Sequence, residues 1–485
     1  MKFLKRMFQA PETDAEKKEN QPDEQAASAQ TAAREKPKQA PANPSGAKDK
    51  PKAEPGGRQH KSAPDDRPVP PDFAELDLPD EINRAVMDLG FTSCTPVQKE
   101  VLPHLLDGKD IIAQAQTGTG KTAAFLISVI TYHLENPENE PRAKGTPFAL
   151  AIAPTRELAM QIAADAEDLS AHTDFGVCTL VGGIDYDKQR KQLQGSVDIV
   201  VATPGRLLDF ARSKTVDLSR VEILILDEAD RMLSMGFIPD VKSIIRLTPR
   251  KENRQTQLFS ATFSEDIRRL ADQWTVDPIR TTIDPEQVAV DSIEQRVDLT
   301  SGEDKYKVLY NLIRSDETGR VIVFANRRDE TRKVADRLYR NGIECGLLTG
   351  DVPQKKRIST LDKFKSGETP VLVATDVAGR GIHVDDISHV VNYNLPEDPE
   401  DYVHRIGRTG RAGNKGISIA LAGEDDAFML PAIEALLGKP MTSQPPPENL
   451  MADPPPYERE APSRSGLDSR GKSGGGKRPP QRRRR

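Results

Sequence analysis

A short apolar segment that ends in three closely spaced carboxylates is the feature that most constrains this chain. Residues 221–226 are almost continuously apolar, which is typical of a central parallel strand covered on both faces. Asp227, Glu228 and Asp230 follow directly. A solvated charge run is the alternative interpretation, but such a run rarely follows a buried strand. The pattern predicts one carboxylate that organises a metal ion and a second that orients water.

About a hundred residues earlier, a glycine-rich loop lies between a predicted strand and a predicted helix. Strand, glycine loop and helix are the context of a phosphate-binding loop, whose backbone N–H groups, lysine and hydroxyl hold phosphates and Mg²⁺. Ala115 stands where the pattern has its first glycine, which is a departure. The predicted nucleotide-binding residues of the loop are Ala115, Gln116, Thr117, Gly118, Thr119, Gly120, Lys121 and Thr122.

The loop and the carboxylate strand together predict hydrolysis of a nucleoside triphosphate, with Mg²⁺ as cofactor. In this interpretation Lys121 and Thr122 hold the phosphates and the metal ion. Asp227 is a second metal ligand and Glu228 orients the attacking water.

Composition excludes several other classes of protein. The chain has 485 residues, enough for two or three domains. Its three cysteines, Cys94, Cys178 and Cys345, are far apart and fit neither a zinc site nor a disulfide framework, which suits a reducing cytoplasm. No segment approaches the roughly 20 apolar residues of a membrane span, and the basic start lacks the apolar core of a secretory signal. We expect a cytoplasmic protein, with no membrane partner and a monomeric core.

Charge is distributed unevenly along the chain. The whole chain carries −6, whereas residues 1–70 carry +3 and residues 462–485 carry +8, which leaves −17 for residues 71–461. A nucleic-acid binder with so acidic a centre must concentrate its positive charge in a cleft or in its tail. The tail ends in four arginines and is predicted to be a disordered arm that binds phosphate backbones. A tail that serves only solubility is the alternative.

The alternation of predicted strands and helices indicates an α/β fold with two tandem parallel sheets. Predicted strands of the first series are 110–115, 148–153, 177–181, 198–202, 222–227 and 257–260, and its helices include 80–89, 97–106, 121–135, 157–171 and 264–275. The second series has strands at 321–324, 371–374, 389–392 and 417–420, with helices at 303–314, 328–341, 353–365 and 427–437. The predicted organisation is a disordered segment 1–70, a first domain 71–283, a linker 284–290, a second domain 291–440, and a disordered Pro-rich then basic tail 441–485.

The second domain has no phosphate loop but carries an arginine-rich segment, residues 404–411. Arginines three apart on a helical turn share one face. Across a cleft, Arg408 and Arg411 would neutralise charge that develops on the γ-phosphate, and His404 belongs to the same catalytic group. A structural or RNA-phosphate cluster is the alternative. The phosphate loop in the first domain favours the catalytic interpretation.

With these motifs the chain resembles the DEAD-box RNA helicases of superfamily 2 across residues 73–437. The resemblance implies two RecA-like domains, ATP as the nucleotide, and an ATP-dependent RNA helicase as the activity. The adenine-reading motif of the family, within residues 71–99, is matched by Gly90-Phe91 and by residues 95–98. Gln98 would read adenine, because an amide both donates and accepts. The resemblance also implies stacking by Phe73, which alone would pass for a core residue, and ribose contact by Asp376.

The resemblance also supplies RNA-contacting residues in both domains. Thr155 and Thr203 sit where strands give way to helices, so helix capping is the alternative for both. Free backbone N–H groups at such positions also bind phosphate. The implied RNA-binding residues are Pro154, Thr155, Arg156, Gly183, Thr203, Gly205, Arg206, Thr349, Gly350, Arg357 and Thr375. Ser260 and Thr262 match the motif that couples nucleotide state to strand opening, through Asp230 or its neighbours.

A narrower resemblance points to a degradosome-associated bacterial subgroup of the family. It rests on residues 348–357, on 186–189, on Gly381-Ile382-His383 and on the arginine-rich tail. It implies a ribonuclease or another degradosome component as a partner beside RNA of little sequence preference. Two rival functions stay open: a processive DNA translocase of the same superfamily, and an ATP-gated RNA clamp or scaffold for which unwinding is incidental.

Overall fold

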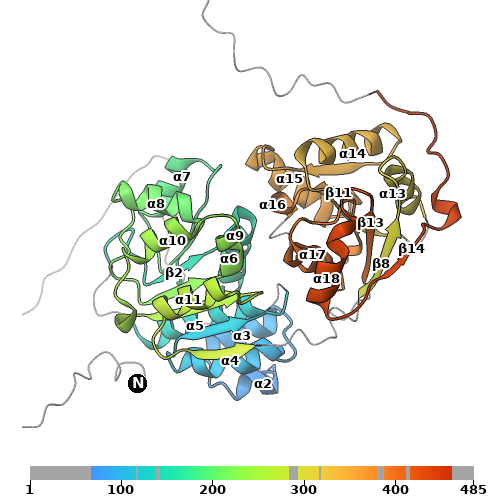
Figure 1. Cartoon of the computed structure of the whole chain (residues 1–485). Coiled ribbons are helices and arrows are strands. Elements are labelled where there is room, and N and C mark those ends of the chain that lie inside the picture. Colours follow the sequence, from blue (N-terminus) through green and yellow to red (C-terminus); the bar gives the residue numbers. More distant parts are fainter. Residues whose placement is uncertain are drawn as a thin grey trace, which may run out of the picture. The chain divides into compact units, whose positions relative to one another are not determined.

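Two seven-stranded parallel sheets organise the chain in the computed structural model (Figure 1). The structure describes residues 67–115, 118–137, 142–282, 293–315, 318–379, 384, 387–410 and 416–460, and all of them belong to one compact unit. The first sheet has the strand order β3-β4-β2-β5-β6-β1-β7 and the second β10-β11-β9-β12-β13-β8-β14. The predicted α/β class with two tandem parallel sheets is confirmed. The predicted linker 284–290 and residues 1–66 of the predicted disordered segment 1–70 lie outside the described residues.

The strands of the first sheet are short, and all except the edge strands β3 and β7 are almost wholly buried. They are β1 Ile111–Gln114, β2 Ala149–Ile152, β3 Val177–Leu180, β4 Ile199–Ala202, β5 Ile223–Leu226, β6 Gln255–Ser260 and β7 Ile279–Thr282. Its helices are α2 Pro71–Ala74, α3 Asp80–Asp88, α4 Pro96–Leu106, α5 Lys121–Glu135, α6 Arg156–Leu169, α7 Tyr186–Gln192, α8 Pro204–Arg212, α9 Ala229–Ser234, α10 Ile238–Ile245, η1 Lys251–Asn253 and α11 Glu265–Trp274. The short helices α7 to α10 and the edge strand β7 are elements that the sequence patterns did not predict.

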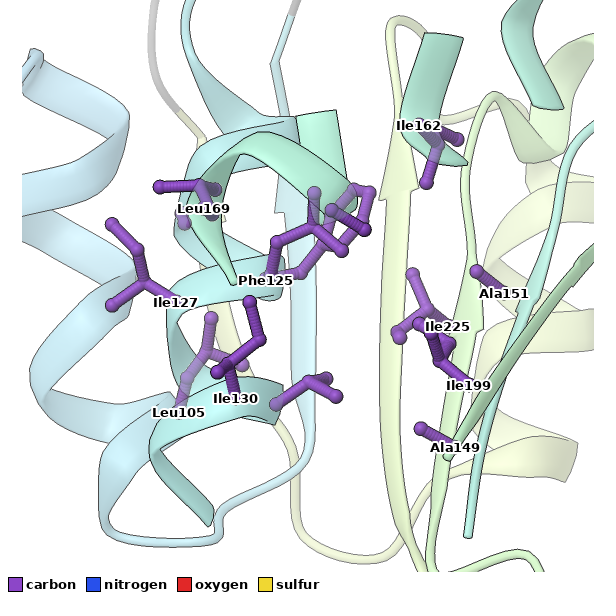
Figure 2. Packing of buried hydrophobic residues seen from close by; sticks show 14 of the residues in the cluster. Leu105, Phe125, Ile127, Ile130, Ala149, Ala151, Ile162, Leu169, Ile199 and Ile225 are labelled. Carbon is purple, nitrogen blue, oxygen red and sulfur yellow. The ribbon is translucent and has the colours of Figure 1, made fainter. Parts of the chain in front are cut away.

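Strand β5 shows why an unbroken apolar run belongs at the centre of such a sheet. Successive side chains of a strand point to opposite faces. Ile223 and Ile225 therefore pack into one core cluster, and Leu224 and Leu226 into a second cluster on the other face. Figure 2 shows the first cluster, where Phe125 and Ile130 of α5 lie between the strands and the neighbouring helices. With both faces covered, the only ligand-accessible part of the strand is its end.

The second sheet repeats this architecture. Its strands are β8 Ile293–Leu299, β9 Arg320–Phe324, β10 Cys345–Leu348, β11 Val371–Ala374, β12 Ile387–Asn392, β13 Gly416–Ala422 and β14 Thr442–Gln444. Its helices are α13 Lys305–Ile313, α14 Arg328–Arg340, α15 Gln354–Lys365, α16 Asp376–Gly379, α17 Pro399–Ile406, η2 Ala427–Met429, α18 Leu430–Leu437 and η3 Glu448–Leu450.

The ordered chain extends beyond the predicted boundary at residue 440. Residues 441–460 are predicted to be disordered, but β14 pairs in parallel with β8 and Leu450 is buried in the second domain's core. The Asn311 side chain donates to the carbonyl oxygens of Leu450 and Ala452, and Tyr457 lies under the guanidinium of Arg340 at 3.6 Å. The prediction is wrong here because it rested on the Pro-rich composition. Composition does not reveal that one leucine is buried and that several backbone groups make contacts. Residues 461–485 lie outside the described part.

Candidate ATP and RNA site

The phosphate loop joins the end of β1 to the start of α5. Ala115 is buried, and its N–H donates to the carbonyl oxygen of Ser260 at 2.9 Å. Gly118 and Gly120 have φ values of 88° and 91°, a left-handed conformation that favours glycine. Lys121 is the first residue of α5. Gln116 and Thr117 lie outside the described residues.

Gln98 ties the start of α4 to this loop. Its Oε1 accepts from the N–H of Thr95 at 2.9 Å, and its Nε2 donates to the carbonyl oxygen of Gly120 at 3.0 Å. The Thr95 hydroxyl completes a capping box by accepting the N–H of Gln98. A Cβ added to Gly120 would lie 2.7 Å from Gln98 Nε2, so glycine is required for this approach. Both hydrogen-bonding ends of the Gln98 amide are thus engaged by backbone groups.

Phe73 has a core position rather than an exposed one. The ring is fully buried and lies 6.0 Å from the ring of Phe91, centroid to centroid. It belongs to the same core cluster as α4 and α5. The position of Phe73 is therefore that of an ordinary core residue, which was the alternative interpretation of this side chain.

The carboxylates that follow β5 are buried beside Lys121. Asp227 and Glu228 are 0% and 1% exposed, and Lys121 Nζ lies 2.8 Å from Asp227 Oδ1. Both oxygens of Glu228 and Oδ2 of Asp227 accept no hydrogen bond from the residues that the structure describes. Glu228 has a φ of 54°, a strained conformation for a non-glycine residue that is typical of functional sites.

The charges of this cluster shift one another's pKa values. Burial alone would lower the pKa of Lys121, but Asp227, Glu228 and Asp230 raise it above its usual range. Burial raises the pKa of Asp227, against the pull of Lys121. The pKa of Glu228 is lowered in spite of burial, because Arg231, Lys121, Arg408 and His404 surround it with positive charge. Arg231 was not among the predicted site residues, since one arginine after an acidic tetrad carries no separate signal.

Helix α17 and the turn after it bring second-domain residues to the same carboxylates. His404 Nε2 lies 3.9 Å from Asp230 Oδ2, and Arg231 Nη1 lies 3.7 Å from Asp401 Oδ1. Arg408 is buried, and its Nε donates to the carbonyl oxygen of His404 at 3.2 Å. Burial, helped by Arg231, lowers the pKa of His404. Arg411 lies outside the described residues.

The predicted coupling residues meet at Asp230. The N–H of Thr262 donates to Asp230 Oδ2 at 3.2 Å, and the Thr262 hydroxyl lies 3.5 Å from the same oxygen. The Ser260 hydroxyl instead accepts the backbone N–H of Asp230 at 3.2 Å. Thr262 also donates to Glu400 Oε2 of the second domain at 3.2 Å. Thr262 therefore contacts carboxylates from both sheets.

Asp376 is engaged by an arginine of its own domain. Arg405 donates Nε to Oδ1 at 2.6 Å and an Nη to Oδ2 at 2.7 Å, which is a two-point pair of the strong kind. Arg405 also donates to the side chains of Asn392 and Asn326. Of the arginines spaced three apart in this segment, Arg405 is thus a structural centre of the second domain, whereas Arg408 lies near Glu228.

Residues of the predicted RNA set line a groove of about 370 Å³. Pro154, Thr155, Arg156, Thr203, Gly205, Arg206, Gly350 and Arg357 are among its lining residues. Unpredicted lining residues include Asp209, Met235 and Phe237. Gly182 lines the groove. A Cβ added to the neighbouring Gly183 would lie 2.5 Å from an Nη of Arg156. Thr349 and Thr375 are not in the lining; both are buried, and the Thr349 hydroxyl donates to Asp351 at 2.7 Å.

Local contacts decide how these groove residues are used. The Thr155 hydroxyl caps α6 by accepting the N–H of Leu158 at 3.2 Å, whereas Thr203 makes no such side-chain cap. Arg357 is paired with Glu157 at 2.8 Å. Arg156 Nη1 lies 3.2 Å from Gln354 Oε1. Arg156 and Arg206 are therefore the groove arginines with no carboxylate partner among the ion pairs of the described residues.

Comparison with known proteins identifies the class that this fold and site define. Residues 95–270 match the DEAD/DEAH box helicase family and residues 304–413 the helicase conserved C-terminal domain. The chain belongs to the DEAD-box family of ATP-dependent RNA helicases. Within it, the chain is 57% identical over 380 residues to the ATP-dependent RNA helicase RhlB of Pseudomonas syringae pv. tomato, and 58% identical over 380 residues to RhlB of Pseudomonas aeruginosa. Each alignment covers 78% of this chain and 96% of the relative.

Solved structures agree with this assignment. The chain is similar to Dbp5 of S. cerevisiae bound to RNA and ADP BeF3, with a TM-score of 0.70 and 33% identity over 77% of this chain and 95% of that one. It is also similar to Mss116p bound to ssRNA and AMP-PNP, with a TM-score of 0.70 and 28% identity over 78% of this chain and 79% of that one. The two sheets are therefore RecA-like domains in tandem. Among the described helices, none is long and apolar enough to cross a membrane.

Proposed function

We propose that this ATP-dependent RNA helicase hydrolyses ATP when RNA is bound and uses the cycle to part short RNA duplexes locally. The observation that carries the proposal is the buried pair of Lys121 and Asp227 beside Glu228, whose carboxylate oxygens accept no hydrogen bond from described residues. A buried charged group without hydrogen bonds is costly, so this arrangement is expected where a bound ligand completes it. The similar Dbp5 and Mss116p structures, which hold RNA together with ADP BeF3 or AMP-PNP, support the pairing of both ligands.

The nucleotide is proposed to lie along the phosphate loop. Lys121 and the N–H groups at the start of α5 would hold the phosphates, and the Gln98 segment would contact adenine. Thr122 and the free Oδ2 of Asp227 fit an Mg²⁺ ion, which takes one or two protein ligands beside substrate phosphates. When bound, the ion would neutralise charge on the phosphates. Asp376 is proposed to contact the ribose, and its carboxylate would then bind both the ribose and Arg405.

Glu228 is proposed to orient the attacking water. The positive groups that lower its pKa keep it ionised, which suits an acceptor for a water proton. Arg408, with Arg411 as predicted from the sequence, would stabilise charge that develops on the γ-phosphate. His404 would hold Asp230 and Asp401 in place through its two ring nitrogens, each 3.9 Å from a carboxylate oxygen.

The groove that contains Arg156 and Arg206 is proposed to receive the RNA backbone. Its lining carries three arginines against Glu157 and Asp209, a net charge of +1, in a chain whose residues 71–461 carry −17. Thr203 has a hydroxyl that does not cap its helix and is thus available to a phosphate oxygen. Contacts to phosphates carry no sequence information, so little sequence preference is expected.

Two measurements test the proposed function. RNA and DNA strands of one sequence are compared as activators of ATP hydrolysis, which separates an RNA helicase from a DNA translocase. A short labelled duplex is then assayed for strand displacement with ATP. Stimulation by DNA as strong as by RNA would contradict the proposal, and ATP-dependent RNA binding without strand displacement would favour the clamp.

The resemblance to the degradosome-associated subgroup motivates a proposal about the partner and the compartment. We propose that the protein acts in RNA turnover in the cytoplasm, beside a ribonuclease, as a monomer. The cysteines support a reducing compartment, because none of the three forms a disulfide. Co-purification at high salt, followed by identification of the retained proteins, tests the partner.

A further inference from the structure

Tyr186, the first residue of α7, packs along one face of helix α8. Its ring stacks on that of Phe210 with centroids 4.2 Å apart and planes at 3°. The guanidinium of Arg206 lies 5.5 Å from the centre of the Tyr186 ring, and the Tyr186 hydroxyl lies 3.1 Å from the Ser213 hydroxyl. Residues 206, 210 and 213 follow helical spacing. One ring therefore contacts two residues of α8 that lie one turn apart and the residue that caps the end of this helix.

Arg206 lines the RNA groove, whereas Tyr186 is not one of the groove's lining residues. A second contact fixes the arginine from the same side, because its Nη1 donates to the carbonyl oxygen of Ile184 at 3.2 Å. Arginine has many rotamers and loses conformational freedom when it is held. Because the Tyr186 ring and the Ile184 carbonyl oxygen already restrain Arg206 in the free protein, less conformational entropy is lost when RNA binds.

The loop that presents Ile184 is itself held by α7. Gln189 is buried, and its Oε1 accepts the N–H of Val181 at 2.9 Å. Its Nε2 lies 3.2 Å from the carbonyl oxygens of Val181, Ile184 and Asp185. Helix α7 thus fixes both the loop with Gly182 and Gly183 and, through Tyr186, the arginine across from it.

We propose that Tyr186 is a positioning residue that holds Arg206 in the orientation that receives an RNA phosphate. The inference rests on the proposed RNA groove and deepens it. Tyr186 acts through Arg206 and does not itself touch RNA. A cation–π contact at an exposed site corresponds to about two- to fivefold in an equilibrium constant, which sets the size of the expected effect.

A double-mutant cycle on RNA-stimulated ATP hydrolysis tests this role in the full-length protein. Tyr186→Ala should raise the RNA concentration for half-maximal stimulation about two- to fivefold, with the maximal rate retained. Arg206→Ala should raise it about tenfold or more, because it removes a hydrogen bond to a charged group, and should lower the log–log salt slope by about 0.7. In the Arg206→Ala background, Tyr186→Ala should add nothing.

Two controls separate positioning from folding. Tyr186→Phe keeps the ring and should restore the wild-type half-saturation. Tyr457→Ala removes a comparable ring–guanidinium contact, with Arg340 at 3.6 Å, outside the groove and should leave half-saturation unchanged. Melting temperatures of all variants check that each is folded at the assay temperature.

The outcomes distinguish this inference from the function on which it rests. An Arg206→Ala protein with unchanged half-saturation and salt slope would remove the RNA contact itself, and both proposals with it. If Arg206→Ala weakens RNA stimulation but the effect of Tyr186→Ala persists in that background, the groove stands and the positioning role is overturned. A Tyr186→Phe protein as impaired as Tyr186→Ala would also overturn it.

Discussion

Lys121 and Asp227 are each other's counter-ion. Their Nζ and Oδ1 atoms lie 2.8 Å apart, and both side chains are at least nine-tenths buried. One comes from the start of a helix and the other from the end of a strand, and neither could be buried alone without a large cost. In its proposed role, Lys121 would exchange this carboxylate partner for a phosphate of the nucleotide.

Glu228→Gln should stop turnover without unfolding the site. Neither Glu228 oxygen accepts a hydrogen bond from the described residues, so the glutamine amide breaks no such bond. The substitution removes only the negative charge that is proposed to position water. We expect kcat to fall ~10²-fold or more, with ATP and RNA binding nearly intact. Steady-state hydrolysis and fluorescent-nucleotide binding measure the two effects.

Lys121→Ala is the contrasting variant, because it leaves Asp227 buried and unpaired and should cost about 3–5 kcal/mol of stability. Near wild-type hydrolysis by Glu228→Gln would show that another group orients the water.

Gln98→Ala should reduce the preference for ATP over GTP. A site that hydrogen-bonds a base edge rejects other bases because its polar groups are then left unpaired. The variant also frees Gly120 from its contact with Nε2, so KM should rise for both nucleotides. Thr95→Ala, which loosens the capping box alone, is the matched control. Equal losses for ATP and GTP would make Gln98 an anchor of the phosphate loop and not a reader of adenine.

Asp165→Asn should stabilise the protein at neutral pH. Burial, with repulsion from Asp168, raises the pKa of Asp165 to about 6. A carboxyl whose folded-state pKa lies above its unfolded value binds protons more tightly when folded. Stability is therefore lost as pH rises from about 4 to about 6 and stays low above that. The neutral amide should restore on the order of 1–2 kcal/mol at pH 7.5 after allowance for partial exposure.

Urea unfolding at pH 7.5 and at pH 4.5 measures this difference. At pH 4.5 Asp165 is largely protonated in the folded protein, so the gain from the variant should be well below the gain at pH 7.5. Asp174→Asn, an exposed site on the same domain, should change stability by less than about 0.5 kcal/mol at both pH values. An equal effect of Asp165→Asn at both pH values would assign it to packing.

Deletion of residues 461–485 should weaken RNA binding and leave the ATPase core intact. Residues 462–485 carry +8 on a chain whose residues 71–461 carry −17. For a single strand, the log–log salt slope falls by ~0.7 for every phosphate that the tail no longer neutralises. RNA titrations of ATPase activity at two salt concentrations should show a higher half-saturation with the maximal rate retained. Identical half-saturation and slope would limit the tail to solubility or to a protein partner.

Deletion of residues 441–485 should, in contrast, destabilise the second domain. It removes β14 from the edge of its sheet and exposes the pocket of Leu450, a loss of about 2 kcal/mol or more. The deletion 461–485 is its matched control and should leave the free energy of unfolding nearly unchanged. Equal stability of the two truncated proteins would show that residues 441–460 contribute little to the free energy of unfolding.

The sequence by itself determined the local chemistry of this protein. Backbone alternation and glycine requirements act over a few residues, so the strand before Asp227 and the glycine loop before Lys121 could be recognised directly. The alternation of predicted strands and helices along the chain was enough to predict two tandem parallel sheets.

Tertiary packing decided which predicted side chains meet. Phe73 matches a motif, yet its ring is in the core against Phe91. Arg405 and Arg408 share one short segment, but the first is held by Asp376 and the second lies near Glu228. Arg231, Gln189 and Tyr186 gave no sequence signal of their roles, because each depends on a partner brought close by the fold. Long-range contacts have no period in the sequence, so only the folded chain fixes them.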